Sequence, residues 1–128
     1  MKSYTDLEQS KRLANILPLE SADMCFNISQ RYNMPPLMTP YSKFNEFFNM
    51  EKTPDFLIPC WSLAALLKLI PSYIIQQGEV YFGILDLNEC CLKYQTNDGV
   101  DLLETKYYDN YIDAAFEMVV WLKENNKL

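Results

Sequence analysis

The sequence predicts an α+β fold, a single domain in which an antiparallel sheet of about four to five strands packs against about three main helices. The first observation is that residues 73–108 contain consecutive short stretches rich in β-branched and aromatic residues, separated by turn sequences. Strands that follow one another as hairpins pair in antiparallel order. The second is helical spacing of apolar residues near both ends of the chain and in its middle. With 128 residues, 49% of them hydrophobic, residues 1–128 suit one domain with its own core.

The first helix is expected over residues 5–17. Thr5-Asp6-Leu7-Glu8 has the pattern of a capping box, in which the first side chain accepts from the backbone N–H three residues later. Pro18 ends this helix, because a proline disfavours helical backbone at the preceding residue. Met24–Ile28 then alternates apolar and polar residues, so we expect a half-buried strand that joins the main sheet.

The segment that follows is irregular. Its prolines predict a loop from Tyr32 to Tyr41. Phenylalanines at helical spacing predict a short helix over residues 41–50. Residues 53–58 are expected to be extended, because Pro54 and Pro59 flank them.

Two further helices are expected at residues 60–70 and 111–125. Pro59 favours the start of the first, which is apolar on almost all sides and is therefore expected to be buried on most of them. Asp109 is expected to cap the last helix. The apolar stripe of the last helix comprises Ile112, Ala115, Phe116, Val119 and Leu122, widened by Met118 and Trp121. Trp61 and Trp121 are either interface anchors or core residues, and their apolar helices favour the core.

The expected sheet strands cover residues 73–76, 80–87, 90–95 and 102–108. Short turn sequences separate them. Asn97-Asp98-Gly99 is the strongest hairpin signal in the chain, because Asp-Gly readily adopts the positive φ angles of a tight turn.

The residue inventory excludes several kinds of chemistry. The chain has no histidine, which excludes Ser-His, Cys-His and His-metal arrangements, and its three glycines do not form a phosphate-binding loop. The four thiols, Cys25, Cys60, Cys90 and Cys91, are expected to be reduced and mostly buried. Cys60 is either a reactive thiol at a helix N-terminus or a core thiol beside Trp61, and the core reading is favoured. We expect no cofactor and no metal.

Two pairs of carboxylates have two interpretations each. Asp113 and Glu117 share a helix face, so they either share a proton or a metal ion, or they form a solvated surface. Asp86 and Glu89 flank a turn, and they too are either a functional pair or part of a solvated surface. The solvated interpretation is favoured for both pairs.

The charge distribution bears on possible partners. Acidic and basic residues balance over residues 1–54, so the whole net charge of −6 lies in residues 55–128. Such an acidic surface repels phosphate backbones, and we expect no direct contact with nucleic acid. The longest apolar run, residues 63–70, is interrupted by Lys68 and is too short for a membrane span. We therefore expect a cytoplasmic protein with no membrane partner.

A partner-binding site is expected in residues 32–53, which combine prolines with methionines and aromatic residues. Prolines restrict the backbone, so less conformational entropy is lost on binding. Methionine and aromatic side chains adapt to the shape of a partner. The alternative is that this segment covers the sheet as part of the core. The candidate contact residues are Met34, Leu37, Met38, Tyr41, Phe44 and Phe47.

Three segments carry a resemblance to known proteins. They are residues 8–13 (EQSKRL), residues 58–67 (IPCWSLAALL) and residues 113–122 (DAAFEMVVWL). With these motifs, the chain resembles a group of small uncharacterised proteins of gut anaerobic bacteria, their prophages and other mobile elements. The resemblance implies a habitat, and it transfers no activity and no functional residues.

The leading functional hypothesis is a non-catalytic protein-binding module, an accessory protein of a phage or mobile element. Its partner is an unidentified protein, and a homodimer is the first to test. One alternative is an acidic decoy that imitates DNA and inhibits a DNA-binding enzyme. The other is an enzyme that uses carboxylates and a metal ion.

Overall fold

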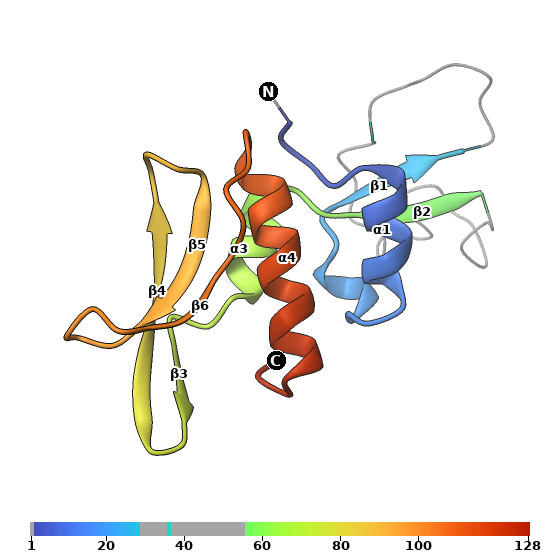
Figure 1. The fold of residues 1–128 in the computed structure, drawn as a ribbon. Helices are drawn as coiled ribbons and strands as arrows, with labels where there is room; N and C mark the ends of the chain where they lie inside the picture. Colours follow the sequence, from blue (N-terminus) through green and yellow to red (C-terminus); the bar gives the residue numbers. More distant parts are fainter. Residues whose placement is uncertain (1, 29–35, 37–55) are drawn as a thin grey trace. The chain divides into compact units, whose positions relative to one another are not determined.

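The computed structural model describes residues 2–28, 36 and 56–128 (Figure 1). They fall into two compact units, an N-terminal unit formed by Tyr4–Ala65 and a C-terminal unit formed by Met1–Ser3 with Leu66–Leu128. The described elements are helices and antiparallel sheets, which confirms the α+β class. That the whole chain forms one domain stays a prediction. Among the described residues, no helix has the length and apolar character needed to cross a membrane.

The first helix, α1, spans Leu7–Ala14 and is shorter at both ends than the expected 5–17. Its capping box is formed by Asp6 and Gln9, so the prediction that Thr5 and Glu8 form it was wrong. The Asp6 carboxylate accepts from the Gln9 N–H at 2.8 Å, and the Gln9 side chain accepts from the Asp6 N–H at 3.1 Å. Thr5 does not cap the helix, because it is buried and its hydroxyl bonds other groups.

After a 3-10 turn at Leu19–Ser21, strand β1 (Met24–Asn27) pairs with strand β2 (Leu57–Cys60). These two strands form a separate antiparallel sheet, with Met24 opposite Cys60 and Asn27 opposite Leu57. The expectation that Met24–Ile28 joins the main sheet was therefore wrong. The reason is that residues 57–60 supply a closer extended partner in the same unit.

Helix α3 spans Leu63–Leu69 and begins three residues after the expected start at 60. It starts late because Pro59 and Cys60 belong to β2. Ser62 caps it, since its hydroxyl accepts from the Ala65 N–H at 3.2 Å. Leu66 is its one buried residue, so the expectation that this helix is buried on most sides was wrong.

The C-terminal unit contains a four-stranded antiparallel sheet in the order β3–β4–β5–β6 (Figure 1). Its strands are β3 (Tyr73–Gln76), β4 (Glu79–Asp86), β5 (Cys91–Gln95) and β6 (Asp101–Glu104). The first three lie within one residue of the expected ranges, whereas β6 ends at Glu104 and not at 108. Past this point the Thr105 hydroxyl accepts from the Leu92 N–H at 3.0 Å, in place of a backbone carbonyl.

Two of the tight turns use left-handed backbone. Gln77 and Gly78 join β3 to β4 with φ angles of 51° and 80°. Gly99 has a φ of 84° in the turn between β5 and β6, which confirms the hairpin predicted from Asn97-Asp98-Gly99.

The last helix, α4, spans Tyr111–Glu124 and is capped by Asn110, whose side chain accepts from the Asp113 N–H at 2.9 Å. The prediction that Asp109 is the cap was therefore wrong by one residue. The buried residues of α4 are Ile112, Ala114, Ala115, Met118, Val119, Val120 and Leu122. Of the expected stripe, Phe116 and Trp121 are half-buried.

Candidate functional site

The partner-binding residues proposed from the sequence lie outside the described residues. They are Met34, Leu37, Met38, Tyr41, Phe44 and Phe47. The expected loop at residues 32–41, apart from Pro36, and the expected helix over residues 41–50 lie there too. This site stays a prediction.

The described sheet has an outer face that carries large apolar side chains. Successive residues of a strand point to opposite faces, and cross-strand partners share a face. Tyr73 pairs with Phe82, and Ile75 pairs with Val80. These four residues form what we call the outer hairpin face. They are exposed by 55%, 40%, 57% and 39%, in the order in which the two pairs are given.

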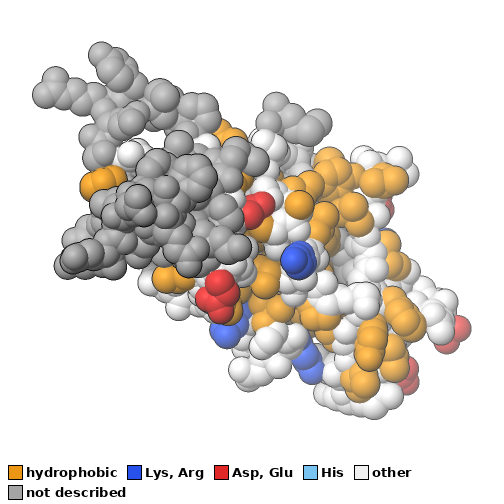
Figure 2. Space-filling model, turned by 180° about the vertical axis from the view of Figure 1, so that it is seen from behind, with side chains coloured by type: hydrophobic (Ala, Val, Ile, Leu, Met, Phe, Trp, Pro, Cys, Tyr) orange, Lys and Arg blue, Asp and Glu red, His pale blue; other side chains and the backbone are white. Residues whose placement is uncertain are grey.

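The opposite face of the same hairpin is better covered. Ile74 is only 5% exposed, and Leu92 and Tyr94, which lie on the same face of the sheet on β5, are buried. Figure 2 shows hydrophobic side chains gathered over the part of the surface where the sheet lies, with few charged side chains among them. The sheet is therefore apolar on both faces, although only one of them is covered within the described residues.

Strand β3 lies at the edge of the sheet. One of its outward-facing backbone carbonyl groups already accepts a hydrogen bond. The Ile75 carbonyl oxygen accepts a hydrogen bond of 2.9 Å from Lys127 Nζ. A lysine beside an edge strand hinders the addition of another strand. A partner can therefore reach the apolar side chains on the face of the hairpin more easily than it can pair with the edge of β3.

The outer face continues onto β5 and β6 with a pair of opposite charges. Lys93 pairs with Ile84 on one side and with Glu104 on the other. On β6, Asp101 pairs with Gln95 and accepts a hydrogen bond of 2.8 Å from its side chain. The face thus carries apolar residues over β3–β4, and Lys93, Glu104 and Asp101 over β5–β6.

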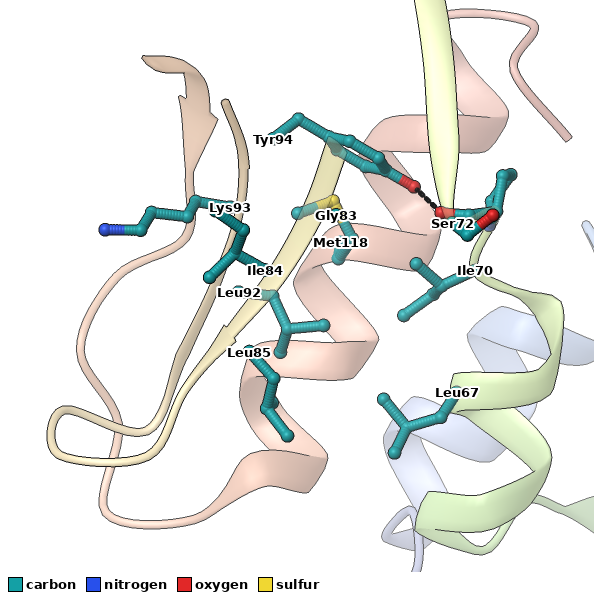
Figure 3. A pocket seen from close by; sticks show the side chains of 11 residues that line it. Leu67, Ile70, Ser72, Gly83, Ile84, Leu85, Leu92, Lys93, Tyr94 and Met118 are labelled. Carbon is teal, nitrogen blue, oxygen red and sulfur yellow. Dashed lines mark hydrogen bonds between the residues drawn. The ribbon is translucent and has the colours of Figure 1, made fainter. Parts of the chain in front are cut away.

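The inner side of the sheet contains a cavity of about 150 Å³ (Figure 3). The side chains that point toward it are Leu67 on α3, Ile70 just after α3, Leu85 on β4, Leu92 on β5 and Met118 on α4. The Tyr94 hydroxyl borders the cavity and donates to the Pro71 carbonyl oxygen at 2.5 Å. Burial raises the pKa of Tyr94 to about 12, so this hydroxyl keeps its proton at neutral pH.

Cys60 belongs to a buried polar cluster in the N-terminal unit. The Thr5 hydroxyl pairs with the Ser10 hydroxyl at 2.7 Å and accepts from the Trp61 N–H at 3.1 Å. Thr5 Oγ1 also lies 3.6 Å from Cys60 Sγ. Burial raises the pKa of the Cys60 thiol, which the hydroxyls of Thr5 and Ser10 offset in part. The surroundings of Cys60 thus favour the packed-thiol interpretation over the reactive one.

The other sequence expectations about thiols and tryptophans are met in part. Cys25, Cys60 and Cys91 are buried, and Cys90 is partly exposed. Trp61 is buried, and its indole N–H donates to the Ser21 hydroxyl at 2.9 Å.

The two carboxylate pairs have structural partners. Asp113 forms a salt bridge of 2.7 Å with Lys2 and accepts from the Asn110 side chain. Glu117 accepts from the Lys106 N–H at 3.1 Å. The Asp86 carboxylate accepts from the backbone N–H groups of Asn88 and Glu89, which orders the turn after β4. Within residues 2–28, 36 and 56–128, no group of three or more acidic or cysteine side chains is placed to hold a metal ion.

Among the described residues, the outer hairpin face and the cavity behind the sheet are candidates for binding. The sequence contained an ambiguous signal for the outer hairpin face. Tyr73, Ile74 and Ile75 are consecutive and apolar, which is typical of a strand with apolar side chains on both faces. Comparison with protein-family models, with curated proteins and with solved structures finds no match to this chain.

Proposed function

We propose that this protein is a non-catalytic protein-binding module that contacts its partner through the outer hairpin face. The observation that carries the proposal is the exposure of four neighbouring large apolar side chains on an ordered sheet: Tyr73, Ile75, Val80 and Phe82. Contiguous exposed apolar patches on folded proteins mark interaction sites. Burying such side chains contributes about 25 cal/mol for each Å² of apolar surface removed from water.

The partner is expected to pack on the face of the sheet. Lys127 already bonds the outward carbonyl of Ile75, so a strand added at the β3 edge would displace it. Packing of one sheet face on another needs no such displacement, and the apolar side chains of the two faces interdigitate.

A second copy of this chain is the partner that the surface fits best. A two-fold dimer brings the same patch of each copy together, so the patch must complement itself. The outer hairpin face carries no charge, which avoids like-charge contacts between two chains of net charge −6. Beside it, Lys93 and Glu104 are cross-strand neighbours of opposite sign, so the lysine of one copy has an acidic counterpart on the other.

The wider role as an accessory protein of a phage or mobile element rests on the resemblance of residues 58–67 and 113–122 to such proteins. Three of the described carboxylates argue against the acidic decoy, which needs acidic side chains spaced like phosphates on one exposed face. Glu79 and Asp86 lie at opposite ends of β4, roughly 23 Å apart at about 3.3 Å per residue. Asp113 is paired with Lys2. We therefore propose the binding module alone.

Sedimentation velocity over a range of concentrations tests this proposal. We expect the wild-type chain to dimerise with a dissociation constant of about 100 µM or tighter. Phe82→Glu places a charge in the patch and is expected to weaken the dimer by about tenfold or more, which corresponds to about 1.4 kcal/mol.

Val100→Glu is the matched control, because Val100 is 59% exposed but lies in the turn between β5 and β6. It is expected to dimerise like the wild type. A wild-type chain that stays monomeric at about 1 mM would overturn the dimer. Equal weakening by both substitutions would show that general charge, and not the outer hairpin face, controls association.

A further inference from the structure

The cavity behind the sheet lies on the face opposite the proposed protein contact and is independent of it. Its volume is about 150 Å³, and apolar cavities of about this volume are large enough to hold benzene. The geometry points to this cavity as a binding site for a small, neutral, apolar molecule about the size of one aromatic ring.

The cavity has a buried floor and an open rim. Leu92, Tyr94 and Met118 form the floor and are exposed by 4%, 0% and 1%. Leu85 lies at the rim and is 39% exposed, while Leu67 is half-buried. A ligand therefore reaches the floor from solvent past the Leu85 side chain. Met118 adapts to the shape of a ligand, because its side chain is unbranched and polarizable.

Two backbone carbonyl oxygens at the cavity already have partners. The Pro71 carbonyl accepts from the Tyr94 hydroxyl, and the Ser72 carbonyl accepts from the Gly83 N–H at 2.8 Å. Lys93 borders the cavity, but its side chain points away from it (Figure 3). A charged ligand would lose its hydration there and gain no ion pair, so the site selects neutral molecules.

Gly83 has no side chain, and this leaves space in the cavity wall beside the Tyr94 ring. A Cβ atom at this position would lie 3.4 Å from the Pro71 carbonyl oxygen and 3.4 Å from the Tyr94 ring. Because Gly83 and Tyr94 are cross-strand partners, the ring lies against the bare glycine backbone on the inner face. Larger residues here would narrow the space beside the ring.

Toluene is a suitable probe, and benzoate is its charged counterpart of similar size. In methyl-detected NMR titrations of the full chain, toluene is expected to give saturable shifts at Leu92 and Met118, with a dissociation constant of about 1 mM or tighter. Benzoate is expected to give no saturable shift at these methyl groups. Shifts that do not saturate with toluene, or equal binding of benzoate, would overturn the proposal.

Two matched substitutions locate the site. Leu85→Trp fills the rim and is expected to weaken toluene binding about tenfold or more. Leu87→Trp makes the same change two residues away, at a position that is 77% exposed in the turn after β4 and does not line the cavity, so toluene binding should be unchanged. Binding that survives Leu85→Trp would place the ligand elsewhere. Native amide spectra of both variants are the check that each is folded. Phe82→Glu should leave toluene binding intact, which separates this test from that of the dimer.

Discussion

Lys127 Nζ donates a hydrogen bond of 2.9 Å to the carbonyl oxygen of Ile75, 52 residues earlier in the chain. The lysine comes from the segment after α4, and the carbonyl belongs to the edge strand of the sheet. Edge strands invite pairing with other chains, and lysine side chains are one means by which proteins oppose it. This contact explains why the apolar hairpin is expected to associate through its face.

Removal of the Lys127 side chain should leave the β3 edge free to pair with strands of other chains. Lys127→Ala is expected to change the free energy of unfolding by less than about 0.5 kcal/mol, because the contact is exposed. It is nevertheless expected to aggregate faster, with thioflavin T fluorescence and light scattering as the measurements. Lys123→Ala removes an exposed lysine near the end of α4 and is the control. If both variants aggregate at the wild-type rate, Lys127 does not protect the edge.

The buried hydroxyl of Thr5 should be important for stability. Thr5→Val keeps the shape but leaves the Trp61 N–H without its acceptor and the Ser10 hydroxyl without its partner. An unsatisfied buried group costs about 1–3 kcal/mol, so a loss of at least this size is expected in urea unfolding. Thr96→Val is the control, because the Thr96 hydroxyl accepts from the Val100 N–H at an exposed site. Equal losses in the two variants would contradict the importance of burial.

Leu66 is the buried residue of α3, and its truncation should leave a cavity. Leu66→Ala is expected to cost about 2–5 kcal/mol in the free energy of unfolding. Leu87→Ala is the matched change at an exposed site and is expected to cost about 0.5 kcal/mol or less. A loss below about 1 kcal/mol for Leu66→Ala would show that this side chain does not contribute to a packed core.

The stability of the chain should fall at high pH in a way that depends on Tyr94. Burial raises the pKa of Tyr94 from 10.0 to about 12 in the folded state. Between these values the unfolded chain releases this proton and the folded chain keeps it, so stability decreases as the pH rises. Tyr94→Phe is expected to be less stable than wild type at pH 8, because it lacks the bond to Pro71, but to lose less stability from pH 10 upward. Parallel curves for the two proteins would contradict this role.

The main sheet could be predicted from local signals. Residues 73–95 alternate β-forming stretches with short turns, and Asp98-Gly99 supplies the positive φ angle that joins β5 to β6. Each of these strands pairs with its neighbour in sequence, so the order of the sheet follows from the order of the chain. The last helix was similarly clear from its apolar stripe.

The small sheet could not be predicted in the same way. Strand β1 pairs with residues 57–60, and no local pattern identifies a partner so far along the chain. Pro59 is compatible with a helix start, yet it lies in β2, because proline is also compatible with extended backbone. Thr5 and Asp6 are both good capping residues, and only the tertiary contacts of Thr5 decide between them.

The candidate site was missed because its sequence resembles that of a buried strand. Tyr73, Ile74 and Ile75 give no polar alternation to mark an exposed face. Only the pairing of the strands shows that Tyr73 and Ile75 share the uncovered face with Val80 and Phe82.

Photo-cross-linking from the outer hairpin face tests the central claim most directly. Tyr73 is replaced by p-benzoylphenylalanine, and chains with ¹⁴N and ¹⁵N are mixed so that links between copies are recognised by mass. We expect links from position 73 to residues of β3 and β4 in the other copy. The same replacement at Leu87, which is more exposed but lies outside the face, is expected to give few. Links between copies that are no more frequent from position 73 than from position 87 would contradict the proposal that this face binds a second copy.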